Sequence, residues 1–267
     1  MRKPAGTVSS DAIRAYWLAY EERNARFLRT RWGDVTADPR FPLIYDANHA
    51  AVIDTASAPT LAEIRAALHP VARETGISYE HVEFLFLDGP QPAFDELAAG
   101  QPERVELDVV MAHDGRTAPG PSREVEVREV ALDEPFWALY RRTRNEFGTT
   151  LAAEVVDQMV ARDRTVLAAA GLRAFAGLVG AQVAGFTTLI RLAGVGYLDN
   201  VVTVPELRGR GVATATVARA VEVSAAAGDA VTFLLAEEGG AGARLYERLG
   251  FRVVARAAGF TRPLPPA

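Results

Sequence analysis

The pattern of apolar and polar positions predicts alternating strands and helices in the last third of the chain. Residues 198–204 and 231–236 are apolar, β-branched runs typical of buried strands. The Ala/Val-rich residues 213–227 between them have a helical pattern, and a second, short helix is predicted to end at Gly250. Strand, helix, strand, helix, strand is the order of parallel strands joined by crossover helices.

Upstream of this region, the pattern predicts one strand, two helices and a hairpin. The strand covers residues 124–130, and the first helix covers residues 132–147, with Asp133 as its N-cap. Thr149 or Thr150 is predicted to cap the next helix. Strands 173–179 and 182–192 then form the hairpin.

The first half of the chain has a similar order of elements. A helix is predicted from Ser9–Asp11 to near Gly33, and the elements that follow are a strand at 41–53, a helix at 60–74, a strand at 81–87, a short helix at 94–99 and a strand at 104–111. Residues 116–122 contain Pro and Gly without periodicity, which is typical of a linker. We therefore expect two α/β domains, at 1–115 and 123–267, with the first a degenerate copy of the second.

Composition excludes several classes of function. The 267 residues carry a net charge of −5, which argues against a nucleic-acid partner, and the absence of cysteine excludes disulfides and thiol nucleophiles. No apolar run approaches the length of a membrane span, and the N-terminus lacks the pattern of a secretory leader. We expect a soluble, cytoplasmic protein without a metal, as a monomer or homodimer.

The turn between strand 198–204 and the helix that follows is the main candidate for chemistry. Pro205 ends the strand, and the turn reads Arg208-Gly-Arg-Gly-Val-Ala213. A Gly-rich turn that opens a helix leaves backbone N–H groups unpaired at the positive end of the helix dipole, which suits a phosphate. The spacing matches neither a nucleotide P-loop nor a dinucleotide-binding turn.

This turn resembles motif A of the GCN5-related N-acetyltransferase (GNAT) superfamily, whose pattern is R/Q-x-x-G-x-G/A. The downstream stretch Ala243-Arg-Leu-Tyr-Glu-Arg-Leu-Gly-Phe251 resembles motif B of the same family. The resemblance extends over about residues 123–262. It implies the GNAT fold, a mixed twisted sheet flanked by helices, which is complete only in the second domain, and it implies acetyl-CoA as the cosubstrate.

The resemblance also implies roles for individual residues. The backbone of Val202 and Val204 would pair with the pantetheine arm, and an N–H near Val202 would stabilise the oxyanion. Tyr246 would protonate the departing thiolate. The pyrophosphate would lie on the turn, at Arg208, Gly209, Arg210, Gly211, Val212, Ala213 and Thr214. Gly239 replaces an Asn that contacts pantetheine in many family members.

The sequence does not single out the base that deprotonates the amine. Asp199 is our candidate, Glu146 and Glu237 or Glu238 are alternatives, and His49 is the histidine to examine. The resulting prediction is an N-acetyltransferase that moves an acetyl group from acetyl-CoA to a primary amine of a small molecule by direct transfer in a ternary complex. The alternatives are a CoA-binding sensor or interaction module without turnover, and transfer of a different acyl group.

Overall fold

The computed structural model describes residues 10–87, 89, 91–113, 124–144 and 151–265. The predicted linker at 116–122 lies outside these residues. The chain packs into two compact units that interleave along the sequence. Of the described residues, the C-terminal unit contains 10–13, 111–235 and 239–252, and the N-terminal unit contains 14–110, 236–238 and 253–265.

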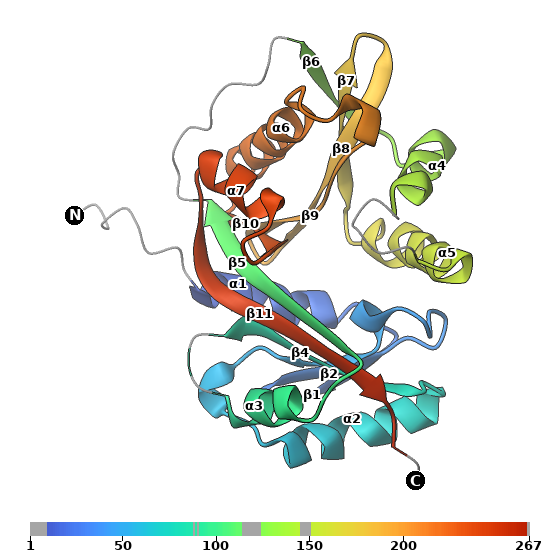
Figure 1. Cartoon of the computed structure of the whole chain (residues 1–267), viewed down its shortest axis with the longest axis vertical. Coiled ribbons are helices and arrows are strands. Elements are labelled where there is room, and N and C mark those ends of the chain that lie inside the picture. The colour runs from blue at the N-terminus through green and yellow to red at the C-terminus, as the bar shows by residue number, and fades with distance from the viewer. Residues whose placement is uncertain (1–9, 88, 90, 114–123, 145–150, 266–267) are drawn as a thin grey trace, which may run out of the picture. The chain divides into compact units, whose positions relative to one another are not determined.

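The C-terminal unit is built on five neighbouring strands in the order β10-β9-β8-β7-β6, of which only β9 and β10 pair in parallel (Figure 1). The strands are β6 (Val125–Val130), β7 (Arg173–Val179), β8 (Gln182–Leu192), β9 (Val195–Thr203) and β10 (Val231–Glu237). The helices are α4 (Glu134–Thr143), α5 (Ala153–Arg162), the π-helix η4 (Asp163–Leu167), the 3-10 turn η5 (Pro205–Leu207), α6 (Val212–Ala226) and α7 (Ala241–Arg248).

Helix α6 lies directly on this sheet because glycines face it. A Cβ at Gly196 of β9 would come within 2.2 Å of Ser224 Oγ, and a Cβ at Gly177 of β7 within 2.9 Å of Val212 Cγ1. The hydroxyls of Thr187 on β8 and Thr216 on α6 lie 2.7 Å apart in the buried contact. The sheet therefore fixes where α6 begins, which determines the position of the candidate site.

The N-terminal unit has the strand order β1-β2-β3-β4-β11-β5, with β3 and β4 parallel. Its strands are β1 (Arg26–Arg29), β2 (Gly33–Ala37), β3 (His49–Val52), β4 (Tyr79–Leu87), β5 (Arg104–His113) and β11 (Phe251–Pro263). Its helices are α1 (Ser10–Glu21), the 3-10 turns η1 (Tyr45–Ala47) and η2 (Thr55–Ser57), α2 (Leu61–Thr75) and α3 (Pro92–Ala99). The first residues of α1, the last of β5 and the first of β11 belong to the C-terminal unit, and the last residues of β10 belong to the N-terminal unit.

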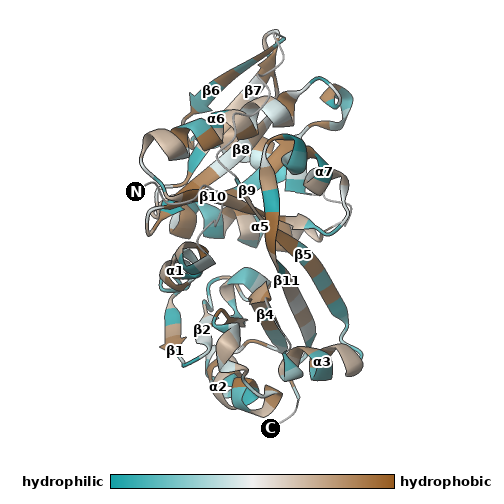
Figure 2. Ribbon diagram, turned by 90° about the vertical axis from the view of Figure 1, so that its left-hand side faces the viewer, coloured by the Kyte–Doolittle hydropathy of each residue, from teal (hydrophilic) through white to brown (hydrophobic). Residues whose placement is uncertain are grey.

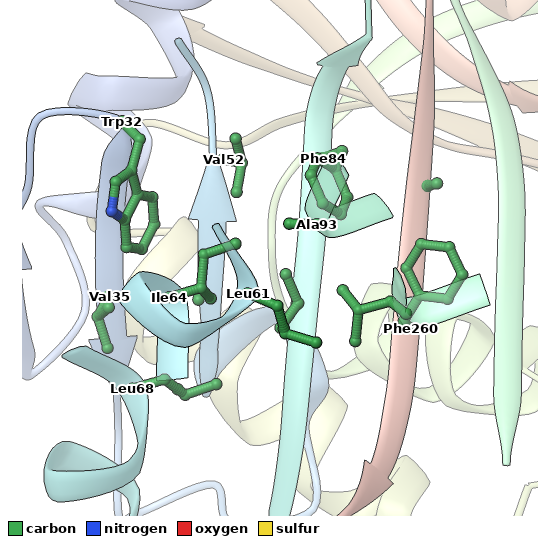
Figure 3. Close-up of a cluster of buried hydrophobic side chains, with 13 residues drawn as sticks. Trp32, Val35, Val52, Leu61, Ile64, Leu68, Phe84, Ala93 and Phe260 are labelled. Atoms are coloured by element: carbon green, nitrogen blue, oxygen red, sulfur yellow. The ribbon is translucent and has the colours of Figure 1, made fainter. Parts of the chain in front are cut away.

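Apolar side chains of α2, α3 and the strands form the core of the N-terminal unit (Figure 3). Trp32, Ile64, Phe84 and Phe260 are at most 3% exposed, and Phe260 comes from β11 near the end of the chain. Coloured by hydropathy, the helices of both units carry hydrophilic as well as hydrophobic residues (Figure 2). In the described part of the chain, no helix combines the length and apolarity that crossing a membrane requires.

The fold class is confirmed as a mixed sheet flanked by helices, but some predicted boundaries were wrong. The first helix ends at Glu21, and β1 and β2 occupy part of the segment predicted to continue it. Of the predicted strand 41–53, only His49–Val52 is a strand. The packed units also differ from the predicted division into 1–115 and 123–267, because β11 pairs antiparallel with β4, from Arg256 opposite Leu87 to Pro263 opposite Tyr79.

We predict that Gly185→Ala will destabilise the C-terminal unit. The new Cβ would lie 2.1 Å from the carbonyl oxygen of Val202 and 2.9 Å from Thr203 Cα, so β8 and β9 would have to separate. Overpacking of this kind costs about 1 to 3 kcal/mol, measurable by urea unfolding. Val183→Ala, on the same strand at a side chain that is 37% exposed, is the control. Equal effects of the two changes would contradict the prediction.

Candidate functional site

A cavity of about 570 Å³ lies in the C-terminal unit, between the end of β9, the turn before α6, and α7. Most of the residues predicted to bind the cosubstrate line it. Its walls are Val201, Val202, Thr203, Arg208, Gly209, Gly211, Val212, Ala213, Thr214, Ala241, Gly242, Leu245, Tyr246 and Arg248. Among the predicted residues, Val204, Arg210 and Asp199 do not line this cavity.

The turn before α6 depends on two left-handed glycines. Gly209 has a φ of 79° and Gly211, the N-cap of α6, has a φ of 82°, a region that side chains with a Cβ rarely adopt. Glycine at 209 is required by this backbone conformation and not by crowding, since an added Cβ would meet no atom within 4 Å. No side chain caps α6, so its first N–H groups have no capping partner at the cavity wall.

The corresponding helix of the N-terminal unit begins differently. Thr60 caps α2, its side chain accepts from the N–H of Glu63, and Glu63 Oε2 accepts from the N–H of Thr60 at 2.9 Å. Arg31 donates to Glu63 at 2.8 Å, and this contact lowers the pKa of Glu63 to about 2. A carboxylate of the chain itself thus occupies the positive end of α2, and no anion site is left there.

Strands β9 and β10 separate beside the cavity. Their parallel pairing runs from Val195 opposite Val231 to Leu198 opposite Leu234, although β9 continues to Thr203. The separation coincides with a bulge in β9, because Thr187 pairs with Val201 and Leu189 pairs with Leu198, which leaves one residue of β8 opposite two of β9. The bulge contains Asp199 and Asn200.

The register of β9 corrects the backbone roles predicted for Val202 and Val204. The N–H of Val204 donates to Ala184 of β8 at 2.9 Å, and the carbonyl oxygen of Val202 also lies on the β8 side, beside Gly185. Because backbone groups of successive strand residues point to opposite edges, the groups on the free edge belong to Val201 and Thr203. The sequence could not reveal this shift of one residue, since it depends on the pairing with β8.

Tyr246 of α7 lies in the cavity wall with its side chain largely buried, at 8% exposure. Gly242, one turn earlier, leaves its ring uncovered on one side, where an added Cβ would lie 3.4 Å from Cε2. Phe251 packs against the ring with centroids 6.0 Å apart. Burial raises the pKa of Tyr246 to about 12, so the phenol is neutral at physiological pH.

The bulge of β9 is the centre of a buried polar network that the sequence did not indicate. Asn200 donates through Nδ2 to Asp199 and to Thr188 Oγ1, and its Oδ1 accepts from Arg144 Nη2 at 2.5 Å. Tyr140 of α4 donates to Asp163, and burial followed by the charge of Asp163 raises the pKa of Tyr140 well above its ordinary value. These residues are far apart in the sequence, and no spacing pattern links them.

The other carboxylates considered as bases are not gathered at the cavity. Glu237 and Glu238 are exposed, and Glu238 pairs with Arg256 at 2.7 Å. Glu146 lies outside the described residues. Within the ranges that the structure describes, no group of three or more His, Asp or Glu side chains is arranged to hold a metal ion.

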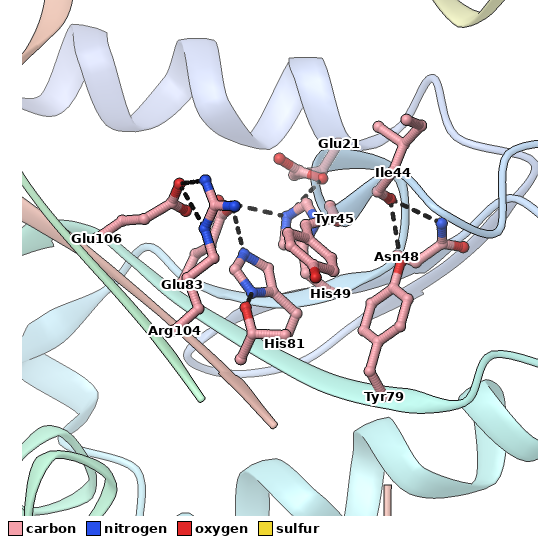
Figure 4. Close-up of polar contacts among 11 residues, drawn as sticks. Glu21, Ile44, Tyr45, Asn48, His49, Tyr79, His81, Glu83, Arg104 and Glu106 are labelled. Atoms are coloured by element: carbon pink, nitrogen blue, oxygen red, sulfur yellow. Dashed lines mark hydrogen bonds and ion pairs between the residues drawn. The ribbon is translucent and has the colours of Figure 1, made fainter. Parts of the chain in front are cut away.

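His49 belongs to an ionic cluster inside the N-terminal unit (Figure 4). Its Nδ1 lies 3.2 Å from the Tyr45 carbonyl oxygen, and its Nε2 lies 3.3 Å from Glu21 and 3.9 Å from Glu83. Burial by itself lowers the pKa of His49, but the charges of Glu21 and Glu83 outweigh it and raise the pKa to about 10. His81 Nε2 contacts Glu83 at 2.9 Å. His49 is therefore a charged, paired group of the protein interior.

One family model matches part of the second half of the chain. Residues 162–253 match the family model described as "Acetyltransferase (GNAT) domain". No curated protein sequence matches the chain. A functionally unknown conserved protein from Staphylococcus epidermidis has a similar structure, with a TM-score of 0.66 at 11% identity, over 88% of this chain and 92% of that one.

Two further solved structures have a similar fold. A GCN5-related N-acetyltransferase from Kribbella flavida is similar with a TM-score of 0.60 at 17% identity, over 98% of this chain and 97% of that one. A tandem GNAT protein from the clavulanic acid biosynthesis pathway is similar with a TM-score of 0.57 at 16% identity, over 76% and 70%. Residues 162–253 thus match the model of a GNAT acetyltransferase domain, and the similar solved structures show that the chain has the GNAT fold, in an arrangement consistent with a degenerate N-terminal copy.

We predict that His49→Gln will destabilise the protein by about 3 kcal/mol near pH 6, because it leaves Glu21 buried without its cationic partner. The folded pKa of about 10 is above the unfolded value of about 6.5, so the stabilisation is complete below pH 6.5 and is lost as the pH rises through 10. The difference in unfolding free energy between wild type and variant should therefore shrink over that range.

His69→Gln is the control for this pH series. His69 contacts Glu80, but Arg65 and Arg262 also donate to that carboxylate and remain after the change. A His49→Gln variant that is as stable as wild type at pH 6 would contradict a charged His49.

Proposed function

We propose that the protein is an acetyl-CoA-dependent N-acetyltransferase that acylates a primary amine of a small molecule by direct transfer in a ternary complex. The observation that carries the proposal is the uncapped N-terminus of α6 at one wall of the 570 Å³ cavity, with Tyr246 at another. Acyl transfer from a thioester that carries a diphosphate requires an anion site and a proton-bearing side chain, and here both face one cavity.

The diphosphate would bind to the turn between Arg208 and Thr214. The N–H groups of Gly211, Val212, Ala213 and Thr214 belong to the turn and the first helical positions, where the helix itself supplies no acceptor. Arg208 is exposed beside the cavity and also donates through Nε to the Thr203 carbonyl at 3.3 Å. Arg210 is exposed and does not line the cavity, so its side chain would contribute only general positive charge near the diphosphate.

The gap between β9 and β10 would receive the thioester. Val201 and Thr203 present backbone groups to this edge, so the pantetheine arm would pair with them in the manner of an added strand. An N–H on the same edge would stabilise the oxyanion of the tetrahedral intermediate, and a single donor of this type contributes about 3 to 4 kcal/mol in other enzymes.

Tyr246 would assist the departure of the CoA thiolate. With a pKa of about 12, the phenol stays protonated and donates a hydrogen bond to the sulfur as the C–S bond breaks. Complete proton transfer to a thiolate of ordinary pKa, about 8.5, is uphill by roughly 5 kcal/mol, so hydrogen bonding is the larger contribution. On the acceptor side, Asp199 is the proposed base, since it belongs to the bulge of β9 at which the pairing with β10 ends.

The experiment that tests the proposal is calorimetry with CoA and acetyl-CoA, followed by a thiol-release assay with a panel of small amines. We expect binding of both compounds and amine-dependent release of free CoA. Binding without turnover would instead support a CoA-binding module, and absence of binding would contradict both functions. Catalysis within residues 123–267, a monomeric or homodimeric state and a cytoplasmic location are further parts of the proposal.

We predict that Tyr246→Phe will lower kcat about 100-fold while the affinity for CoA stays within a factor of about two. The phenyl ring keeps the packing against Phe251 and removes only the hydroxyl. Steady-state kinetics and calorimetry on the same preparation check the two halves of the prediction. Unchanged turnover would remove Tyr246 from the mechanism.

We also predict that Gly211→Ala will weaken CoA binding about tenfold. A residue with a Cβ in the left-handed region costs about 1 to 2 kcal/mol, and the turn would shift to relieve this strain. Gly228→Ala is a matched control at the other end of α6, with a φ of 84° and no atom within 4 Å of the added Cβ. Both variants should lose similar stability, and only Gly211→Ala should lose affinity in calorimetry. Equal affinity losses would indicate a global effect.

A further inference from the structure

Arg144, at the C-terminal end of α4, is a buried cation with no carboxylate partner in the described part of the chain. Arg144 is 8% exposed, and no carboxylate of the described residues lies within 4.0 Å of its guanidinium nitrogens. Nη2 donates to Asn200 Oδ1, the guanidinium carbon lies 3.8 Å from the centre of the Tyr140 ring, and Nε is buried without a hydrogen-bond partner. One amide oxygen and one ring face are weak compensation for the loss of water.

Two other arginines of the same unit, the buried Arg162 and the partly exposed Arg191, have acidic partners. Arg162, which is 4% exposed, lies 3.7 Å from Asp163. Arg191 binds Asp229 through two nitrogens, at 2.6 and 2.8 Å. Tyr140 offers Arg144 only its ring, because its hydroxyl donates to Asp163. Both of these arginines therefore have an anionic partner, whereas Arg144 has none among the residues that the structure describes.

The position of Arg144 connects this cation to the gap between β9 and β10. Asn200, its hydrogen-bond partner, lies in the β9 bulge and is followed directly by Val201, which lines the cavity. The same amide group donates to Asp199, the proposed base. One side-chain amide thus separates a cationic group from an anionic one at the edge where the acyl group would react.

We propose that Arg144 binds a carboxylate of the acceptor, so that the acceptor is a small amino acid-like molecule with its amine toward Asp199 and its carboxylate on the Arg144 guanidinium. This inference rests on the proposed acetyltransferase function and names the substrate class. The unpartnered Nε belongs to the edge of the guanidinium that matches the two oxygens of a carboxylate. The short bridge through Asn200 favours acceptors in which few bonds separate the amine from the carboxylate.

The first experiment measures thermal unfolding of the full chain and does not require turnover. A buried cation kept for a ligand costs stability in the free protein, so Arg144→Met should leave the unfolding midpoint unchanged or higher. Arg191→Met, which leaves Asp229 without its cationic partner, should lower the unfolding midpoint. Sodium acetate, compared with sodium chloride at equal ionic strength, should raise the wild-type midpoint by about 1 to 2 °C and leave that of Arg144→Met unaffected.

The second experiment measures CoA release with matched pairs of acceptors, each an amino acid and its carboxamide. For the preferred pair, kcat/KM should be about 10- to 100-fold higher for the acid than for the amide in the wild type. In Arg144→Met this ratio should fall to about one, with CoA affinity by calorimetry retained.

The outcomes separate this inference from the function on which it rests. Acetate stabilisation that depends on Arg144, together with an acid preference, supports the inference. A midpoint lowered by Arg144→Met as much as by Arg191→Met, an acetate effect that survives the change, or turnover without any acid preference would overturn it. Failure to bind CoA would contradict the proposed function, whereas the acetate comparison would still decide whether Arg144 is an anion site.

Discussion

The unpaired N–H groups at the start of α6 are the feature on which the candidate site depends. They remain available because Gly211 supplies no side-chain cap and because two left-handed glycines shape the turn. The helix can project them into the cavity only because glycines of β7 and β9 let α6 approach the sheet closely. Helix α2 shows the alternative, since Thr60 and Glu63 close its N-terminus and neutralise its positive end.

The second requirement is an edge of β9 that no strand covers. A bulge at Asp199 and Asn200 ends the pairing with β10, and the remaining residues of β9 keep their bonds to β8. Hydrogen bonds between Asn200 and Thr188 hold this irregular backbone in place, and Arg144 donates to the side chain of Asn200. Asn200 bonds to both Arg144 and Asp199, so the bulge and the proposed acceptor site share one side chain.

The sequence predicted most of the C-terminal elements, because their signals are local. Runs of β-branched residues marked β9 and β10, Pro205 marked the end of β9, and the Gly-rich turn marked the start of α6. The short helix before Gly250 was also correctly predicted. The largest errors in the elements lie in the weakly periodic segment 22–53, where β1, β2 and β3 are four or five residues long and gain their stability from pairing. The cap predicted at Thr149 or Thr150 was also wrong, since α5 begins after Ala152, which makes no side-chain cap.

The amino-acid sequence by itself determined the order of the strands and helices and the glycine turn, since each follows from residues close together in the chain. Only the tertiary structure decided which groups meet: that β11 pairs with β4, that Val201 and Thr203 occupy the free edge, and that carboxylates from α1 and β4 flank His49. It also decided that Arg144 is buried beside Asn200, with no carboxylate partner among the described residues. These features depend on strand register and on contacts between distant segments, which local propensity does not encode.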